Sequence, residues 1–264
     1  MIRVIRSEWI KLRRPGMLIG GLSSMVLVAV LGAVLGVAAA GSHDSTGPRA
    51  GDALSLAQLH SSSGLARALG QSTMLLGVVA LCIGAAALAS EYSTGTLRNL
   101  LVREPRRLRL LGGMALGVLT FVAAATLLAL VVAAGAALAI ASTKGIGTSA
   151  WFSSAGLAPL GRASLNLIGS TLGFALIGMV LGVVLRTPVA AIGVGVAYAL
   201  PVEAILSSTV NGIDRYLPGQ LLGVVAQGGS HSVSYAAASL TLLLYGVVAV
   251  LGAGVLFWRR DVAT

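Results

Sequence analysis

LLGGMALGVLTFVAAATLLALVVAAGAALAIA, residues 110–141, is the stretch that decides the fold. An α-helix rises about 1.5 Å per residue, so about 20 apolar residues suffice to cross the hydrocarbon core of a bilayer, which is about 30 Å thick. This stretch is longer than an upright span needs. We therefore predict a transmembrane helix that either tilts or projects beyond the bilayer.

Five further apolar runs lie on either side of this stretch, and each is long enough to cross a bilayer. The segments between the runs, among them residues 41–70 and 142–162, have the polar, turn-forming composition of loops. We predict an all-α membrane protein, a single transmembrane domain over residues 1–264 with six helices. The predicted spans are 17–40, 71–89, 110–141, 163–185, 189–206 and 235–258.

The overall composition supports a membrane protein and excludes two other classes. Hydrophobic residues make up 56% of the 264 residues and charged residues only 10%, against about 25% charged in soluble domains. A soluble globule would lack a polar surface, and a disordered chain would need more charge and less apolar content. The lone cysteine, Cys82, lies inside the second run, so we expect no disulfide within the chain and assign it a packing role.

The net charge of +10 predicts the orientation of the chain rather than a nucleic-acid partner. Six spans place both termini on the same side, and 13 of the 18 Lys and Arg residues fall on that side. Because positive charge is retained in the cytoplasm during insertion, we predict that both termini of this multi-pass protein are cytoplasmic. The basic residues expected outside are Arg49, Arg67, Lys144, Arg162 and Arg215.

Residues 1–15 present one apolar helical face, formed by Ile2, Ile5, Trp9 and Leu12. This spacing predicts an N-terminal amphipathic helix in the membrane interface, and the alternative is a basic anchor without fixed structure. The apolar run that follows is too long for the core of a cleavable signal peptide, which has about 7–15 residues. We therefore expect the first span to be retained.

The sequence lacks the motifs of an ATPase or a metal enzyme. A P-loop needs a Gly-Lys pair followed by Ser or Thr, whereas Lys11 follows Ile10 and Lys144 follows Thr143. The three histidines fall in or beside predicted outer loops and have no paired spacing that would bind a metal. We therefore expect no catalytic residue, no metal site and no cofactor in this chain.

The predicted cytoplasmic segment 90–109, between the second and third spans, is more elaborate than a hairpin connection requires. Leu97, Leu100 and Leu101 fall at helical spacing, and Pro105 would end the helix. This pattern predicts a short amphipathic helix with arginines beside its leucines, held by another protein. The alternative is a basic hairpin that lies on anionic lipid.

The same segment carries a run of motif residues between the second and third of six spans: Glu91, Gly95, Thr96, Leu97, Arg98, Leu100, Leu101, Pro105, Arg106 and Arg107. This pattern resembles the permease subunit of type-two ATP-binding-cassette (ABC) exporters. The six-span layout is similar over the full length, and the outer segment 207–234 is similar to the short re-entrant helix that such permeases carry before their sixth span, here at 220–226. The sequence departs from many relatives at Met114, where they have a lysine.

The resemblance implies a transport subunit without an ATPase site of its own. Two six-span permeases in the lipid of a bacterial plasma membrane would form the substrate pathway, as a homodimer or, alternatively, as a pair of different chains. Two separate ABC-type ATPase subunits would bind ATP and Mg²⁺. Those subunits would dock on a coupling helix at 95–103, which includes Arg103, and Glu91 would join it to the second span. The implied cargo is multidrug or lipid-like, and export and lipid flipping both stay open. A second, smaller contact is implied at Arg186, Thr187 and Pro188.

Glu203 is the only acidic residue inside a predicted span and is therefore a candidate for the substrate pathway. Because it lies toward the outer surface, the alternative is that its carboxylate reaches the outer water. Asn166, Ser170 and Thr171 on the fourth span either line the same pathway or hydrogen-bond between helices. Two other classes of function stay open: a proton-coupled secondary transporter that uses Glu203, and a non-transporting membrane assembly or sensor protein.

Overall fold

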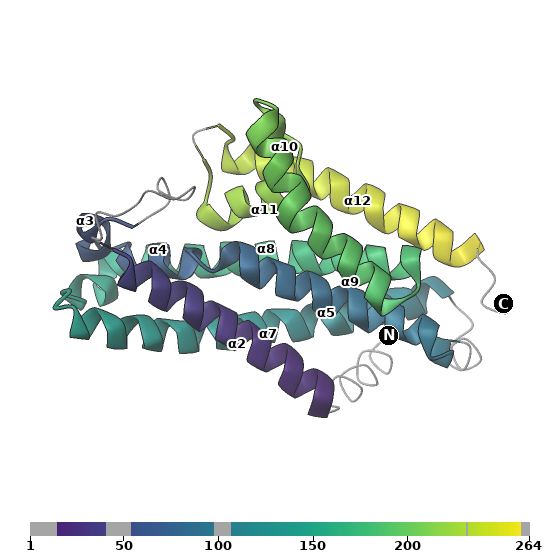
Figure 1. Ribbon diagram of the computed structural model, residues 1–264, viewed down its shortest axis with the longest axis horizontal. Helices are drawn as coiled ribbons and strands as arrows, with labels where there is room; N and C mark the ends of the chain where they lie inside the picture. Colours follow the sequence, from purple (N-terminus) through teal and green to yellow (C-terminus); the bar gives the residue numbers. More distant parts are fainter. Residues whose placement is uncertain (1–14, 41–53, 98–106, 231, 260–264) are drawn as a thin grey trace.

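The computed structural model describes residues 15–40, 54–97, 107–230 and 232–259, and every regular element in these ranges is helical. Six helical segments of this part are long and apolar enough to cross a membrane, which confirms the predicted all-α, six-span membrane fold. Residues 1–14 of the predicted interfacial helix lie outside the described ranges. The spans are α2 (Pro15–Ala38), α5 (Thr73–Ser93), α7 (Arg107–Thr143), α8 (Ser154–Leu185), α9 (Pro188–Ala197) with α10 (Glu203–Thr209), and α12 (Tyr235–Arg259) (Figure 1).

The bundle has two ends, which we name after an aromatic residue at each. At the Tyr92 end, α5, α8 and α12 finish while α7 and α9 begin, and aromatic and arginine contacts join them. At the Trp151 end, the Lys144 ammonium after α7 donates a hydrogen bond to the carbonyl of Ala38, the last residue of α2. The first span therefore begins, and the last span ends, at the Tyr92 end. That this end faces the cytoplasm stays a prediction.

Two spans, α7 and α8, are longer than a bilayer requires. They have 37 and 32 residues, which corresponds to about 55 Å and 48 Å. The apolar pattern predicts a fourth span from residue 163, but α8 already begins at Ser154. Helical hydrogen bonding includes the residues before the apolar run, Arg162 among them, because it does not require apolar side chains. Short helices of the connecting segments pack on both spans.

Those short helices form a cap at the Trp151 end. The composition of residues 41–70 and 142–162 predicts loops, but parts of both fold into α3 (Leu56–His60), α4 (Gly64–Gly70) and η1 (Ser149–Phe152). Trp151 is fully buried, and its indole N–H donates to the Leu59 carbonyl oxygen at 2.7 Å. The loop prediction is wrong here because a single buried tryptophan organises short helices whose own apolar pattern is too brief to recognise.

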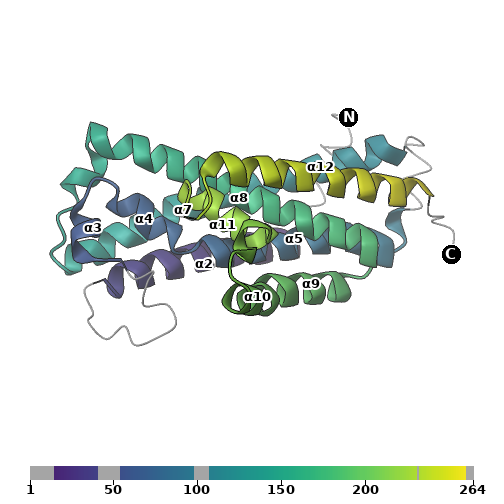
Figure 2. The same ribbon diagram turned by 90° about the horizontal axis from the view of Figure 1, so that it is seen from above.

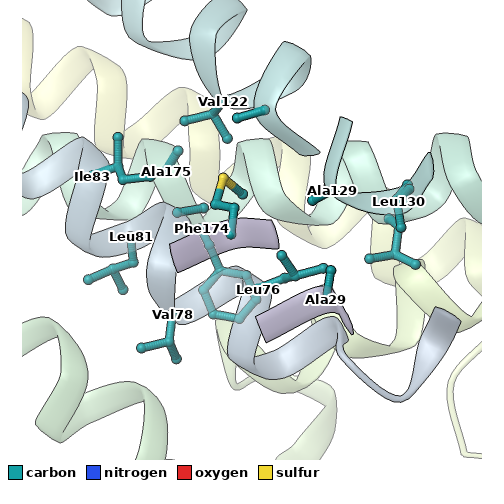
Figure 3. Close-up of a cluster of buried hydrophobic side chains, with 14 of the residues drawn as sticks. Ala29, Leu76, Val78, Leu81, Ile83, Val122, Ala129, Leu130, Phe174 and Ala175 are labelled. Atoms are coloured by element: carbon teal, nitrogen blue, oxygen red, sulfur yellow. The ribbon is translucent and has the colours of Figure 1, made fainter. Parts of the chain in front are cut away.

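Helices α5 and α8 form the centre of the bundle and run parallel to one another. A Cβ atom on Gly178 would lie 2.0 Å from the Leu81 carbonyl oxygen, and one on Gly84 would lie 2.2 Å from the Ala175 carbonyl oxygen. Small residues allow membrane helices to approach this closely. Figure 3 shows the buried cluster along this contact, to which α2 and α7 also contribute. Its labelled side chains include Ala29 of α2, Val122 of α7 and Phe174 of α8.

The outer spans are much less buried than the central pair. In the most apolar window of α5, 56% of the residues are buried, against 22% in the span formed by α9 and α10 and 11% in α12. A further helix, α11 (Pro218–Gln227), lies between α10 and α12 and packs on α8 (Figure 2). It covers the segment 220–226 for which the resemblance implies a short re-entrant helix.

Candidate functional site

The Tyr92 ring is the meeting point of three helix ends. The Phe257 ring of α12 approaches it edge-on, with 6.3 Å between ring centroids and 81° between ring planes. The Arg186 guanidinium, from the turn between α8 and α9, lies 5.7 Å from the centroid of the same ring, within the range of a cation–π interaction. The end of α5 is thereby packed against the ends of α8 and α12.

The turn at Arg186, Thr187 and Pro188 is tight and defined by the backbone. Arg186 has φ of 60°, in the left-handed region, and its amide N–H donates to the Gly182 carbonyl at 3.0 Å to close α8. Thr187 is extended, and Pro188 occupies the first turn of α9, where its missing N–H costs nothing. A left-handed conformation costs a residue with a Cβ about 1 kcal/mol or more, so the contacts of the folded bundle must offset this cost at Arg186.

The first residues of the predicted coupling segment form a second ordered turn beside it. After α5 ends at Ser93, Gly95 adopts φ of 68°, and helical structure resumes at Thr96 and Leu97. The Thr96 hydroxyl donates a hydrogen bond to the Glu91 carboxylate across this turn. Leu97 is 1% exposed, so its side chain anchors the segment to the bundle. The remaining predicted coupling residues, Arg98, Leu100, Leu101, Arg103 and Pro105, lie outside the described ranges.

The start of α7 completes this end of the molecule. The Arg107 guanidinium donates to the carbonyl oxygen of Trp258 near the end of α12 at 3.2 Å. The structure therefore brings the described residues of both predicted contacts, 91–97 and 186–188, to the Tyr92 end. The sequence interpretation missed Tyr92, Phe257 and Trp258, although aromatic residues at the ends of apolar runs are typical of membrane interfaces and could have drawn notice.

Glu203, the candidate for the substrate pathway, is fully buried. Its two carboxylate oxygens accept hydrogen bonds from the backbone N–H groups of Gly219 at 2.9 Å and Gln220 at 3.0 Å, in the first turn of α11. The Tyr198 side chain also interacts with the carboxylate. Glu203 therefore does not reach the outer water, which was the alternative. These partners are distant backbone groups that a sequence pattern does not identify.

Of the three candidate pathway residues on α8, two form hydrogen bonds to neighbouring helices. The Thr171 hydroxyl lies 3.1 Å from the Thr126 hydroxyl of α7, and the Asn166 side-chain oxygen accepts from the Tyr235 hydroxyl of α12 at 3.2 Å. The Ser170 hydroxyl is buried without a hydrogen-bond partner among the described residues. The contacts of Asn166 and Thr171 join helices, so the structure does not gather the four candidate residues into one site.

The fold and its apolar helices define a multi-pass, all-α membrane protein. Residues 61–263 match a family described as "Protein of unknown function (DUF2705)", so the chain belongs to this family. No curated protein matches the chain. The family description assigns no activity.

Proposed function

We propose that this chain is the membrane-spanning permease subunit of an ATP-driven ABC exporter. In this proposal two copies form the substrate pathway, and separate ATPase subunits supply ATP, Mg²⁺ and the energy of hydrolysis. The observation that supports the proposal best is the contact between Arg186 and Tyr92. It joins two segments that are remote in the sequence and that the resemblance independently implicates in ATPase docking.

The contacts of the Tyr92 end are suited to transmit a movement of a docked ATPase to the membrane spans. The Glu91–Thr96 hydrogen bond ties the start of the coupling segment to α5, and Leu97 buries it in the bundle. Arg186 and Phe257 then connect α5 to the ends of α8 and α12. Because the backbones of α5 and α8 are in close contact, a displacement of this end would move both helices in the membrane core. Little of the displacement would be absorbed by side-chain rearrangement between them.

The proposal places the Tyr92 end in the cytoplasm of a bacterial cell, where ATP is available. The sparsely buried apolar faces of α2, α12 and the α9–α10 span leave surface for lipid and for a second copy of the chain. The cargo class, multidrug or lipid-like, follows from the resemblance alone. A substrate screen on ATP hydrolysis by the assembled complex would identify it.

Co-purification with an ABC-type ATPase subunit tests the proposal, and a neighbouring gene that encodes a soluble chain with a P-loop would supply the first candidate. The two chains, co-expressed and extracted in mild detergent, should elute as one complex that hydrolyses ATP. Leu101→Asp should release the ATPase, because a charge would replace an apolar docking residue. The matched control is Gly147→Asp, which adds the same charge at the Trp151 end, where a Cβ meets no atom within 4 Å. Failure to form a complex, or its retention in Leu101→Asp, would contradict the proposal.

A proton-coupled secondary transporter is the competing proposal, because Glu203 is a buried carboxylate within a span. Reconstitution of the chain alone separates the two proposals. In liposomes with a pH gradient and no ATPase, the exporter proposal expects no substrate movement. Movement that collapses with the gradient would favour the secondary transporter.

A further inference from the structure

The fifth span consists of two helical halves joined by an irregular turn. α9 ends at Ala197, a π-helical turn η2 (Tyr198–Val202) follows, and α10 begins at Glu203. Pro201 lies in this turn, where its ring and missing N–H disfavour regular α-helical hydrogen bonding. Turns of this kind are common where a helix bends for function.

The two halves are held by the bundle in different ways. α9 packs on α5 and α8 through Ala191 and Gly195, and a Cβ on Gly195 would lie 2.5 Å from the Leu81 side chain. In α10, by contrast, Glu203 is the one buried residue, and Ile205 is 62% exposed. Figures 1 and 2 show α10 standing away from the layer of α5, α7 and α8.

The Glu203 carboxylate ties this exposed half to α11. The other hydrogen-bonding side chains of α10, Ser207, Ser208 and Thr209, bond within their own helix. Glu203 instead accepts the two N–H groups at the start of α11, which satisfies donors that a helix terminus leaves open. α11 is itself anchored, since Leu222 packs against Gly173 of α8.

We propose that the two hydrogen bonds between the Glu203 carboxylate and α11, which we call the pin, hold the outer half of the fifth span against α11. Breaking these hydrogen bonds lets α10 rotate about η2. Glu203 is then a positioning residue for an outer gate, rather than a residue that touches cargo. The pin and the hinge are properties of this chain alone. The role of this rotation as the gate of an export pathway rests on the proposed function.

Distances between spin labels on the two halves test the pin. In a Cys82→Ala background, Gly193→Cys on α9 and Ser208→Cys on α10 place labels about 22 Å apart along the span, by the rise of about 1.5 Å per residue. A Cβ at Gly193 meets no atom within 4 Å, so a label fits there. The full chain in phosphatidylcholine–phosphatidylglycerol nanodiscs should give one narrow distance distribution by double electron–electron resonance.

Glu203→Gln should add a second distance population. The amide has nearly the same shape, but its NH₂ group faces one of the α11 N–H donors, so at most one of the two hydrogen bonds survives. Asp214→Asn, the same change at an acidic residue in the adjoining outer segment, should keep the parent distribution. An unchanged distribution in Glu203→Gln, or an equal change in Asp214→Asn, would overturn the pin.

Gly219→Ala breaks the same contact without removing charge. A Cβ at Gly219 would lie 2.4 Å from a Glu203 carboxylate oxygen, so this variant should also produce the second population, even if Glu203→Gln folds poorly. Neither measurement needs the ATPase, so the pin survives if the exporter proposal fails. If both variants change the distance but leave ATP-dependent transport by the complex unaltered, the role as a gate is wrong.

Discussion

At the scale of single residues, the strongest stability prediction concerns Trp151. Its indole N–H donates to the Leu59 carbonyl at 2.7 Å, and the side chain is fully buried. Trp151→Phe leaves that carbonyl without its donor and removes buried volume, so we expect a loss of about 2 kcal/mol in the free energy of unfolding. Trp258→Phe is the matched control, since Trp258 is 64% exposed and its replacement should cost less than about 0.5 kcal/mol. Equal losses in both variants, measured by denaturation in mild detergent, would contradict this interpretation.

Single residues also mark where the sequence could not predict the candidate site. Glu203 stands out in the sequence because it is the one acidic residue in a predicted span, and in the structure it is buried within the span formed by α9 and α10. Its partners, Gly219 and Gln220, contribute backbone N–H groups that every residue except proline carries. The pairing therefore depends on where α11 packs, which is a property of the whole bundle.

At the scale of elements, the packing of α5 on α8 gives a second prediction. A Cβ on Gly178 would lie 2.0 Å from the Leu81 carbonyl oxygen, so Gly178→Ala must push the two helices apart, at a cost of about 1–3 kcal/mol. Gly169→Ala on the same helix meets no atom within 4 Å. It should be neutral or stabilise the protein by up to about 1 kcal/mol, because alanine favours helix more than glycine does. Detergent denaturation of both variants checks the difference, and a Gly178→Ala protein as stable as the parent would contradict it.

Element boundaries show what an apolar pattern can and cannot define. Long runs predict all six spans, because crossing a bilayer imposes both length and apolar character. The same pattern places the start of the fourth span near residue 163, although α8 begins at Ser154 and carries the polar Arg162 within it. Helices α3 and α4 were missed for a related reason: with five and seven residues, they are too short for periodicity to identify.

At the scale of the whole molecule, the charge distribution of the described residues leaves orientation undecided. Four basic residues lie toward each end: Arg107, Arg109, Arg186 and Arg259 at the Tyr92 end, and Arg67, Lys144, Arg162 and Arg215 toward the other. The excess that predicts a cytoplasmic Tyr92 end comes from residues outside the described ranges, chiefly 1–14 and 98–106. The exporter proposal requires this orientation, because its ATPase must meet cytoplasmic ATP.

Labelling of single cysteines in intact cells therefore tests whether the Tyr92 end faces the cytoplasm, as the proposed function requires. In the Cys82→Ala background, Gly147→Cys at the Trp151 end should react with a membrane-impermeant maleimide added to intact cells, because this exposed position is predicted to face outward. Arg109→Cys, exposed at the Tyr92 end, should react only after the membrane is permeabilised. Labelling both variants after permeabilisation controls for reactivity. If Arg109→Cys reacts in intact cells and Gly147→Cys does not, the Tyr92 end faces outward, and ATPase docking at Tyr92 and Arg186 is impossible.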